Sequence, residues 1–301
     1  MNQIDTVTYA LNGRNEMKRT ASNKKLGNKK SAHNLGMPPV ALTIAGSDPC
    51  GGAGIQIDLK TFAACDVWGQ AVITALTAQN SLNVTRSFPV PSDMVSEQIE
   101  VLMEDVSPQA IKTGMLVNSD IISAVVKTVP PAIPLVIDPV MLATSGFCLT
   151  HADALTVFIE ELIPRATLVT PNLFEAEVLT GYTDLCKQDD IRDAANLILG
   201  MGARAVVIKG GHGTGSESVD MAVTHDEEVY LSAPRAPYDV HGSGCCFSAA
   251  ATAFLASGYS IYDACNQAKQ VVTLGIQRAI KTPLGRYIVN PCRFSDADSS
   301  L

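Results

Sequence analysis

Short apolar runs alternate along the chain with longer stretches in which apolar positions recur every three or four residues. A short apolar run is typical of a buried strand, and the longer pattern is typical of a helix with one buried face. The predicted strands are residues 40–45, 71–77, 110–114, 135–138, 167–170 and 205–209. A first helix is predicted to follow the glycine-rich loop 46–54 and to end at about residue 66, and another begins at Pro171-Asn172. Further helices are predicted over 92–106, with Ser92 as the cap, and over 119–129, 152–163, 190–201, 244–257 and 261–280. Residues 219–231 are predicted to form a hairpin. This alternation predicts an α/β fold with a central, mainly parallel sheet sandwiched by helices.

Polar and glycine-rich segments follow the predicted strands. They are residues 46–54, 79–80, 112–115, 138–146, 170–175 and 209–215. The carboxyl ends of parallel strands meet at one edge of such a sheet, and the ligand binds in the crevice outside that edge. No internal repeat or linker divides the chain, so residues 37–301 are predicted to form a single domain around one crevice.

The turn at residues 242–245, Gly-Ser-Gly-Cys, stands directly before an apolar run of small residues that is typical of a buried helix. A helix N-terminus offers unpaired backbone N–H groups and the positive end of the helix dipole, which favours an anion site. The same field is expected to lower the pKa of the Cys245 thiol. The alternative is an ordinary entry into a helix with a buried cysteine. The chain has neither a P-loop nor a G-x-G-x-x-G motif.

Charge is divided unevenly between the two ends of the chain. Residues 1–36 hold seven basic and two acidic residues, whereas the remainder holds 15 basic and 28 acidic residues. An acidic body argues against a nucleic-acid binder. The basic segment 1–36 is predicted to be a disordered tail, with a transit peptide or a start at Met37 as alternatives.

Composition places the chain among globular proteins, since it is 47% hydrophobic and 17% charged. No apolar run approaches the roughly 18 residues of a membrane span, so no membrane insertion is expected. The eight cysteines show no C-x-x-C pair or Cys/His ligand spacing. They are expected to be reduced thiols of a cytoplasmic protein, without a structural zinc site.

The segment 45–56, Ala-Gly-Ser-Asp-Pro-Cys-Gly-Gly-Ala-Gly-Ile-Gln, resembles the opening motif of the bacterial hydroxymethylpyrimidine/phosphomethylpyrimidine kinases, which belong to the ribokinase-like superfamily. The resemblance continues in order through nearly all of residues 40–291. Its further motifs lie at 72–80, 112–116, 138–141 with 145–146, 170–176, 209–212, 233–235 and 241–245.

This resemblance implies a function in thiamine biosynthesis. Members phosphorylate 4-amino-5-hydroxymethyl-2-methylpyrimidine, and then its monophosphate, with ATP and Mg²⁺. The expected partner is this small pyrimidine, and a homodimer is compatible with the resemblance. The other interpretations are a pyridoxal kinase of the same fold, or a diverged pyrimidine- or nucleotide-binding protein without catalysis.

The resemblance also assigns the turn at residues 242–245. Backbone N–H groups of Gly242, Ser243 and Gly244 would hold the developing negative charge of the transferred phosphoryl group. Cys245 occupies the position of the aspartate that serves as base in the related sugar kinases. A thiolate there would accept the proton of the substrate hydroxyl, or Cys245 would only shape the anion site.

Substrate-binding residues follow from the same resemblance. Gln79 corresponds to the glutamine that reads the pyrimidine, since an amide offers both a donor and an acceptor. Gly46, Met115 and Val140 correspond to positions that line the ring pocket. Asp48 would orient the substrate hydroxyl or cap the helix that follows.

The remaining matched residues concern ATP and magnesium. Asn172 and Glu175 correspond to an Asn-x-x-Glu motif that helps hold Mg²⁺, with Asn172 as a plain helix cap as the alternative. Lys209, with Gly210 and Gly211, would reach the nucleotide phosphates. His212 is expected to be structural.

The chain departs from the family pattern at several positions. Asp239-Val240 replaces Asn-Thr, Thr113 replaces isoleucine, Cys50 replaces serine, and residues 283–285 only loosely resemble a Gly-His-Gly motif. An inward-pointing Asp239 carboxylate would disfavour ATP.

Overall fold

The computed structural model describes residues 36–142, 146, 149–151, 153–211 and 215–292. The predicted tail, apart from Gly36, and His212 lie outside these residues. No helix within the described ranges has the length and apolar character that a membrane span needs.

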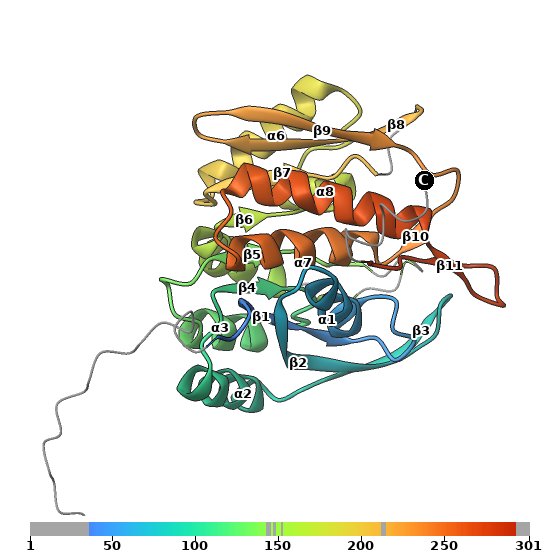
Figure 1. The fold of residues 1–301 in the computed structure, drawn as a ribbon. Helices are drawn as coiled ribbons and strands as arrows, with labels where there is room; N and C mark the ends of the chain where they lie inside the picture. Colours follow the sequence, from blue (N-terminus) through green and yellow to red (C-terminus); the bar gives the residue numbers. More distant parts are fainter. Residues whose placement is uncertain (1–35, 143–145, 147–148, 152, 212–214, 293–301) are drawn as a thin grey trace, which may run out of the picture.

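A nine-stranded sheet forms the centre of the molecule, in the order β3-β2-β1-β4-β5-β6-β7-β8-β9 (Figure 1). Strands β2 to β7 in this order are parallel, and the pairs β2–β3, β7–β8 and β8–β9 are antiparallel. The strands are β1 (Val40–Ser47), β2 (Trp68–Gln79), β3 (Val84–Pro89), β4 (Ala110–Thr113), β5 (Leu135–Ile137), β6 (Leu168–Val169), β7 (Ala205–Ile208), β8 (Glu217–Thr224) and β9 (Glu228–Pro234). The prediction of a mainly parallel sheet is confirmed.

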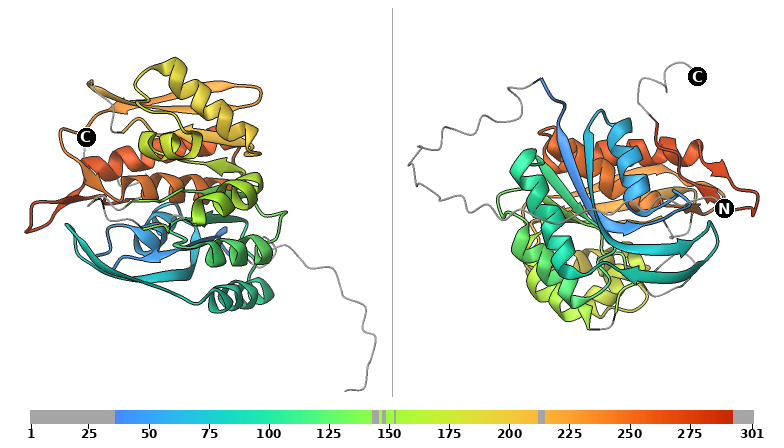
Figure 2. Two further views of the ribbon diagram at one scale, coloured as in Figure 1. Left: turned by 180° about the vertical axis from the view of Figure 1, so that it is seen from behind. Right: turned by 90° about the horizontal axis from the view of Figure 1, so that it is seen from below.

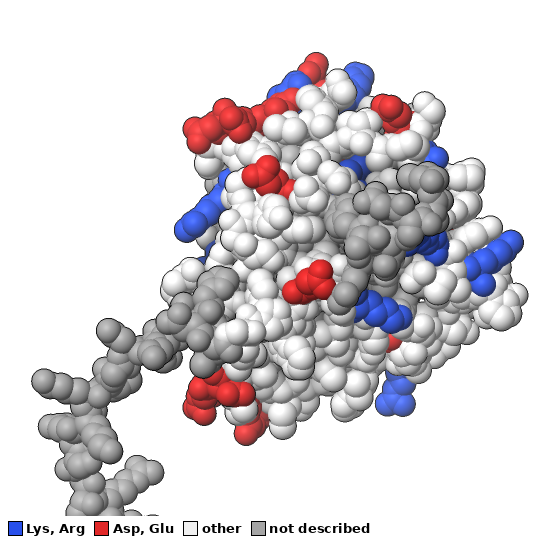
Figure 3. Space-filling view, in the orientation of Figure 1, with Lys and Arg blue, Asp and Glu red and all other residues white. Residues whose placement is uncertain are grey.

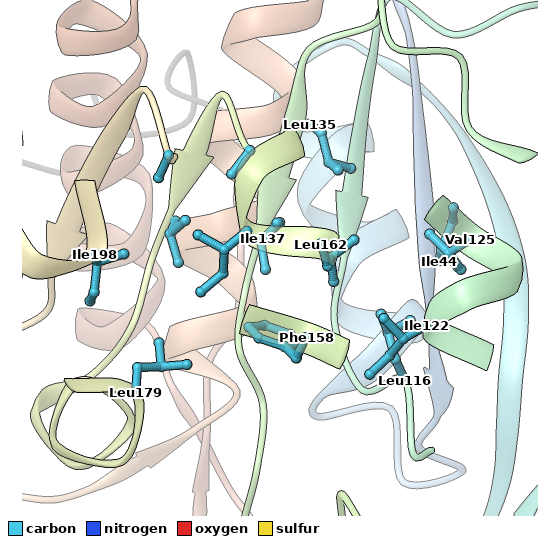
Figure 4. Packing of buried hydrophobic residues seen from close by; sticks show 14 of the residues in the cluster. Ile44, Leu116, Ile122, Val125, Leu135, Ile137, Phe158, Leu162, Leu179 and Ile198 are labelled. Atoms are coloured by element: carbon cyan, nitrogen blue, oxygen red, sulfur yellow. The ribbon is translucent and has the colours of Figure 1, made fainter. Parts of the chain in front are cut away.

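Helices cover both faces of the sheet (Figure 2). One layer contains α2 (Ser92–Asp105), α3 (Ser119–Thr128), α4 (Ala154–Val157), α5 (Leu173–Thr180) and α6 (Gln188–Gly200). The other layer contains α1 (Gly54–Ala64), α7 (Ser243–Ala256) and α8 (Ile261–Gln277). Successive residues of a strand point to opposite faces of the sheet. In β5, Leu135 and Ile137 therefore pack against the first helix layer, as Figure 4 shows, and Val136 packs against the second.

Two helix predictions are wrong in detail. Ser92 is the first residue of α2 and not its cap, since the preceding Pro91 holds the cap position without a side-chain hydrogen bond. The single helix predicted at 152–163 is instead α4 followed by a π-helical turn (Phe158–Leu162) and a 3₁₀ turn (Ile163–Arg165). Pro164 lacks an N–H and cannot continue the regular helical ladder, which explains the irregular end.

A second, three-stranded sheet was not predicted. It consists of β10 (Val240–His241), β12 (Tyr287–Ile288) and β11 (Ile280–Lys281), in that order. The parallel pairing of His241 with Ile288 ties the start of α7 to the end of the chain. Each strand has only two residues, which is too short for a periodicity to be recognised. Strand β3 was missed as well, because half of its positions are polar.

The charge pattern agrees with an acidic body. Figure 3 shows acidic side chains gathered on one face near α2 and near the β8–β9 hairpin, whereas the basic side chains visible there are scattered. Within the described part of this face, the basic residues form no continuous area of the kind that binds nucleic acid.

Candidate active site

One cavity of about 990 Å³ opens at the carboxyl ends of the parallel strands. Its size suits a nucleotide and a small second substrate together. The predicted site residues that line it are Gly46, Asp48, Gln79, Met115, Val140, Asn172, Glu175, Lys209, Gly211, Gly242, Ser243, Gly244 and Cys245. Only Gly210 among the predicted site residues does not line it, so the rule about strand ends brought the predicted segments together correctly.

The turn before α7 is held tightly against the loop before α1. Gly242 has a φ of +81°, and a Cβ there would lie 1.8 Å from the carbonyl oxygen of Gly52. Only glycine fits this position, because a side chain would be strained and would collide with backbone. Ser243 begins α7, a 14-residue helix whose N-terminus faces the cavity. The geometry of an anion site at a helix start is therefore present.

Asp48 organises the loop that faces this turn. Its carboxylate accepts hydrogen bonds from the backbone N–H groups of Cys50 (2.9 Å), Gly52 (3.2 Å) and Ala53 (2.8 Å), and it lies 3.3 Å from His241 Nε2. Burial would raise the pKa of Asp48, but these hydrogen bonds outweigh burial and lower the pKa. The carboxylate is thus engaged by the loop before α1, and it does not cap the helix, whose N-cap Ala53 has no side-chain cap hydrogen bond.

The thiol of Cys50 is the third member of this cluster, and its Sγ lies 3.2 Å from Asp48 Oδ2. Among the described residues, Asp48, Cys50 and His241 are the only group whose ligand atoms could approach a common metal ion. Burial, followed by the hydrogen bond to Asp48, raises the pKa of Cys50 to about 11. Because every one of these contacts serves the loop, we interpret the cluster as structural.

Cys245 lines the cavity and is partly exposed. The prediction of a lowered thiol pKa is wrong, since burial raises the pKa of Cys245 to about 12. Lys112 and the backbone N–H of Gly54 lower the pKa, whereas Asp138 and Asp58 raise it further. Desolvation among packed side chains is therefore the largest influence on the pKa of this thiol.

The buried ion pair of Lys112 and Asp58 acts on this thiol, and no role for it was predicted from the sequence. Lys112 Nζ lies 2.9 Å from Asp58 Oδ2, and both side chains are 0% exposed. Thr43 Oγ1 donates a 2.6 Å hydrogen bond to the same carboxylate oxygen. Burial alone would lower the pKa of Lys112, but the charges of Asp58 and Cys245 raise it, so the ammonium keeps its proton. The signal in the sequence was a lysine within an otherwise apolar strand.

A second ion pair also acts electrostatically on Cys245. Lys209 Nζ is 3.0 Å from Asp138 Oδ1, and Ser248 Oγ donates a 3.0 Å hydrogen bond to Asp138 Oδ2. Burial would lower the pKa of Lys209, but Asp138 and Glu175 raise it. Burial would raise the pKa of Asp138, yet Lys209 and Lys112 lower it. Asp138 was quoted within a motif, but its role as the partner of Lys209 was missed.

Asn172 and Glu175 form a capping box at the start of α5. The side chain of Asn172 accepts from the Glu175 N–H, and Glu175 Oε2 accepts from the Asn172 N–H, each at 2.8 Å. The cap interpretation of Asn172 is confirmed, and it fixes the Glu175 carboxylate at the cavity wall. Burial raises the pKa of Glu175 to about 7, although Lys209 partly opposes this.

The pyrimidine-side residues lie at the end of β2 and beside β4. A Cβ on Gly46 would lie 2.9 Å from Met115 Sδ, so glycine leaves room for this methionine. Thr74 Oγ1 donates a 2.6 Å hydrogen bond to the Met115 carbonyl oxygen, which fixes the backbone of Met115. Gln79 lines the cavity beside Thr77, whose Oγ1 lies 3.3 Å from Gln79 Oε1.

The opposite wall of the cavity was largely missed. It consists of the segment 233–240 and one face of α8, including Val272 and Ile276. Arg235 hydrogen-bonds the carbonyl oxygens of Gly210, Gly211, Gly215 and Glu217. Nothing in the α8 sequence distinguishes a cavity-lining apolar residue from a core residue.

Gly210 itself supports this wall from behind. Its N–H donates a 2.9 Å hydrogen bond to Asp220 Oδ1, and a Cβ there would lie 1.9 Å from the Val219 carbonyl oxygen. Asp220 is in turn paired with Lys269 at 2.8 Å.

Asp239 is exposed at the rim of the cavity.

Comparison with solved structures defines the class to which the fold belongs. The chain aligns with a pyridoxal kinase from Staphylococcus aureus in complex with AMP-PCP and pyridoxal, at a TM-score of 0.78 and 35% identity, over 85% of this chain and 94% of that chain. It also aligns with a phosphomethylpyrimidine kinase from Clostridium difficile, at a TM-score of 0.69 and 40% identity, over 79% of this chain and 99% of that chain. The fold is that of the ribokinase-like small-molecule kinases, as predicted.

Sequence comparison then defines the family. The sequence profile of phosphomethylpyrimidine kinase matches residues 48–290. The hydroxymethylpyrimidine/phosphomethylpyrimidine kinase of Rhizobium meliloti is 42% identical over 252 residues, which are 83% of this chain and 95% of the relative. The chain belongs to the phosphomethylpyrimidine kinase family, and the resemblance recognised in its motifs is confirmed.

Proposed function

We propose that this protein uses ATP to phosphorylate 4-amino-5-hydroxymethyl-2-methylpyrimidine, and then its monophosphate, for thiamine diphosphate biosynthesis. One observation carries the proposal. In a member of the phosphomethylpyrimidine kinase family, the pyrimidine-side residues, the anion turn and Lys209 all line one cavity.

The pyrimidine would lie between β2 and β4. The Gln79 amide offers a donor and an acceptor to a ring nitrogen and the exocyclic amine beside it. Gly46, Met115 and Val140 supply the apolar surface for the ring. This arrangement directs the hydroxymethyl group toward the turn at residues 242–245.

In the first phosphorylation, the Cys245 thiolate would accept the proton of the substrate hydroxyl. The hydroxyl oxygen then bonds to the γ-phosphorus, the bond from that phosphorus to the β–γ bridging oxygen breaks, and ADP leaves. The N–H groups of Gly242, Ser243 and Gly244 would stabilise the negative charge that develops on the transferred group. The second phosphorylation needs no such base, because its acceptor is a phosphate with a second pKa of about 6.

ATP would lie along the opposite wall, with its phosphates directed toward Lys209. To reach them, the Lys209 ammonium must leave Asp138 and turn into the cavity, which its partial exposure allows. Gly210 and Gly211 would shape the adjoining backbone, and Asn172 contributes by holding Glu175 in place.

The carboxylates of Glu175 and Asp138 fit Mg²⁺, which prefers hard oxygen ligands and retains several waters. Both line the cavity close to Lys209, and Glu175 would be the principal ligand. When bound, the metal neutralises charge on the nucleotide phosphates. A homodimer and a cytoplasmic location remain predictions from the sequence.

A pyridoxal kinase is the second candidate, because the aligned Staphylococcus aureus structure carries that name and contains pyridoxal. Pyridoxal also has a ring of similar size with a hydroxymethyl acceptor. The Gln79 amide favours the aminopyrimidine, since it can pair with an adjacent acceptor and donor.

Single-turnover assays with Mg-ATP would test the proposal. We expect faster phosphoryl transfer to the hydroxymethylpyrimidine and to its monophosphate than to pyridoxal at equal concentration. Faster transfer to pyridoxal would favour the second candidate, and no transfer to any of the three would favour a non-catalytic binding protein.

Replacement of Cys245 by alanine separates the two steps. We expect the first phosphorylation to fall by about 10²- to 10⁴-fold, the usual contribution of a general base. The second phosphorylation should fall much less, because its acceptor is already ionised. Equal losses in both steps would indicate that Cys245 only shapes the anion site.

A further inference from the structure

The ion pair between Lys112 and Asp58 is costly for the stability of the fold. Both side chains are fully buried, and Asp58 Oδ1 is among the buried polar atoms without a hydrogen-bond partner. A buried ion pair often contributes no more stability than apolar residues of similar volume. Stability alone therefore gives no reason for two charges at this position.

Lys112 and Cys245 line the same cavity, and their charges act on one another. The charge of Lys112 favours the thiolate of Cys245, and a thiolate there in turn favours the protonated ammonium. The other charged groups that act on this thiol are Asp58 from α1 and Asp138 after β5, which both oppose the thiolate. Lys209, after β7, also interacts with it.

Only one of these two lysines remains in place during turnover. Under the proposed function, Lys209 turns toward the nucleotide phosphates. Lys112 borders the cavity, but its side chain has no exposed surface and its ammonium is bound to Asp58. Its charge acts on the chemistry through its neighbour, and not by direct contact.

We propose that Lys112, fixed by Asp58, is a positioning residue whose buried ammonium stabilises negative charge on the Cys245 sulfur. This inference rests on the proposed function for its role in turnover, but not for its effect on the thiol. Asp58 and Thr43 hold the ammonium in place, and the desolvated surroundings strengthen its field at the sulfur.

The test uses the full-length double variant Asp58→Leu/Lys112→Met, which removes both charges and leaves an apolar pair. The single Lys112→Met variant would leave Asp58 buried without its cation and could fail to fold, whereas the double variant avoids this. The readout is the rate of alkylation of Cys245 by iodoacetamide, resolved by mass spectrometry, without substrate or nucleotide. At about pH 8 to 9 this rate is proportional to the small thiolate fraction.

We expect alkylation of Cys245 to be severalfold slower in the double variant, because Lys112 acts on the thiol more strongly than the opposing charge of Asp58. If Lys112 and Asp58 had only a structural role, their removal would loosen the site and expose the sulfur. The alkylation of Cys245 would then be faster and not slower. The double variant Asp220→Leu/Lys269→Met is the matched control, since it removes another buried lysine–aspartate pair in the same way. This control should leave the alkylation rate of Cys245 unchanged.

An alkylation rate in the folded double variant that is equal to or faster than that of the natural protein overturns the inference. Slower alkylation together with a lower kcat for the first phosphorylation, at unchanged KM, supports it in full. Slower alkylation with an unchanged kcat supports the coupling of Lys112 to the thiol, and it rejects Cys245 as the base. Failure of the inference and failure of the proposed function are thus separate results.

Discussion

Two lysine–aspartate pairs act electrostatically on Cys245, and they differ in the exposure of their side chains. The side chains of Lys112 and Asp58 are both 0% exposed, whereas those of Lys209 and Asp138 are 13% and 2% exposed. The distances between the paired atoms are nearly equal, at 2.9 and 3.0 Å. The difference between the pairs is therefore one of burial and not of contact geometry.

Burial decides what each pair can do. The sealed pair, Lys112 and Asp58, holds a charge at a fixed point, because neither side chain is exposed to water. The open pair can exchange partners, because the Lys209 ammonium borders the cavity in which we place the phosphates. The same two residue types thus provide a fixed electric field at Lys112 and Asp58 and a movable contact at Lys209 and Asp138.

The largest expected effect is on stability, at the sealed pair. Lys112→Met should lower the free energy of unfolding by about 3–5 kcal/mol, since it leaves the Asp58 carboxylate buried without its partner. Urea denaturation measures this. Lys209→Met is the matched comparison and should cost less, because water in the cavity can reach Asp138. Equal losses would contradict the difference in burial.

The next effect is on turnover, at the open pair. Lys209→Met should reduce kcat/KM for ATP by about 10²- to 10³-fold, as expected when one preorganised electrostatic contact to the transferred group is lost. Steady-state kinetics at saturating pyrimidine measures this, and Lys209→Arg, which keeps a positive charge, should retain more activity. A loss below about tenfold would indicate that Lys209 stays with Asp138.

Glu175, beside the open pair, gives a pH-dependent effect. Its pKa is raised from 4.5 to about 7, so its contribution to stability is complete below pH 4.5 and is lost as the pH rises through about 7. Glu175→Gln removes this dependence and should stabilise the protein by on the order of 2 to 3 kcal/mol above pH 7.

Thermal unfolding at a series of pH values tests this, and we expect the two proteins to converge near pH 4.5. The same variant should lose kinase activity if Glu175 binds magnesium. A stability difference that does not change with pH would contradict the raised pKa.

The smallest effect concerns Thr113, the strand neighbour of Lys112. Thr113 Oγ1 is buried without a hydrogen-bond partner, unlike the fully engaged ammonium next to it. Thr113→Val should therefore stabilise the fold by about 1 kcal/mol, because it removes an unsatisfied hydroxyl at nearly constant volume. Chemical denaturation measures the change, and a loss of stability would indicate that the hydroxyl has a partner such as water.

The sequence predicted much of the fold and of the cavity. The parallel strands β1, β2 and β4 to β7 were recognised because their apolar runs are local. The rule for strand ends placed the segments that follow these strands in one crevice. The turn at 242–245 was recognised because glycines stand directly before a helix. These are local signals that depend on neighbouring residues.

Other features depend on residues far apart in the chain. Lys112 and Asp58 are separated by 54 residues, and Lys209 and Asp138 by 71. The wall formed by α8 was missed because its apolar residues resemble those of a core. Asp48 was placed in the correct loop, but the N–H groups around its carboxylate became apparent only in the folded turn.

At Cys245, the properties that the local sequence determines can be separated from those that the tertiary structure determines. The sequence by itself determined that a cysteine follows a glycine-rich turn at a helix start, with a long apolar helix behind it. Only the tertiary structure decided the state of its thiol, because desolvation and the buried charges of Lys112, Asp58 and Asp138 come from separate segments. The helix dipole is a property of local sequence, whereas burial is a property of the whole fold, and burial is the largest influence on the pKa of this thiol.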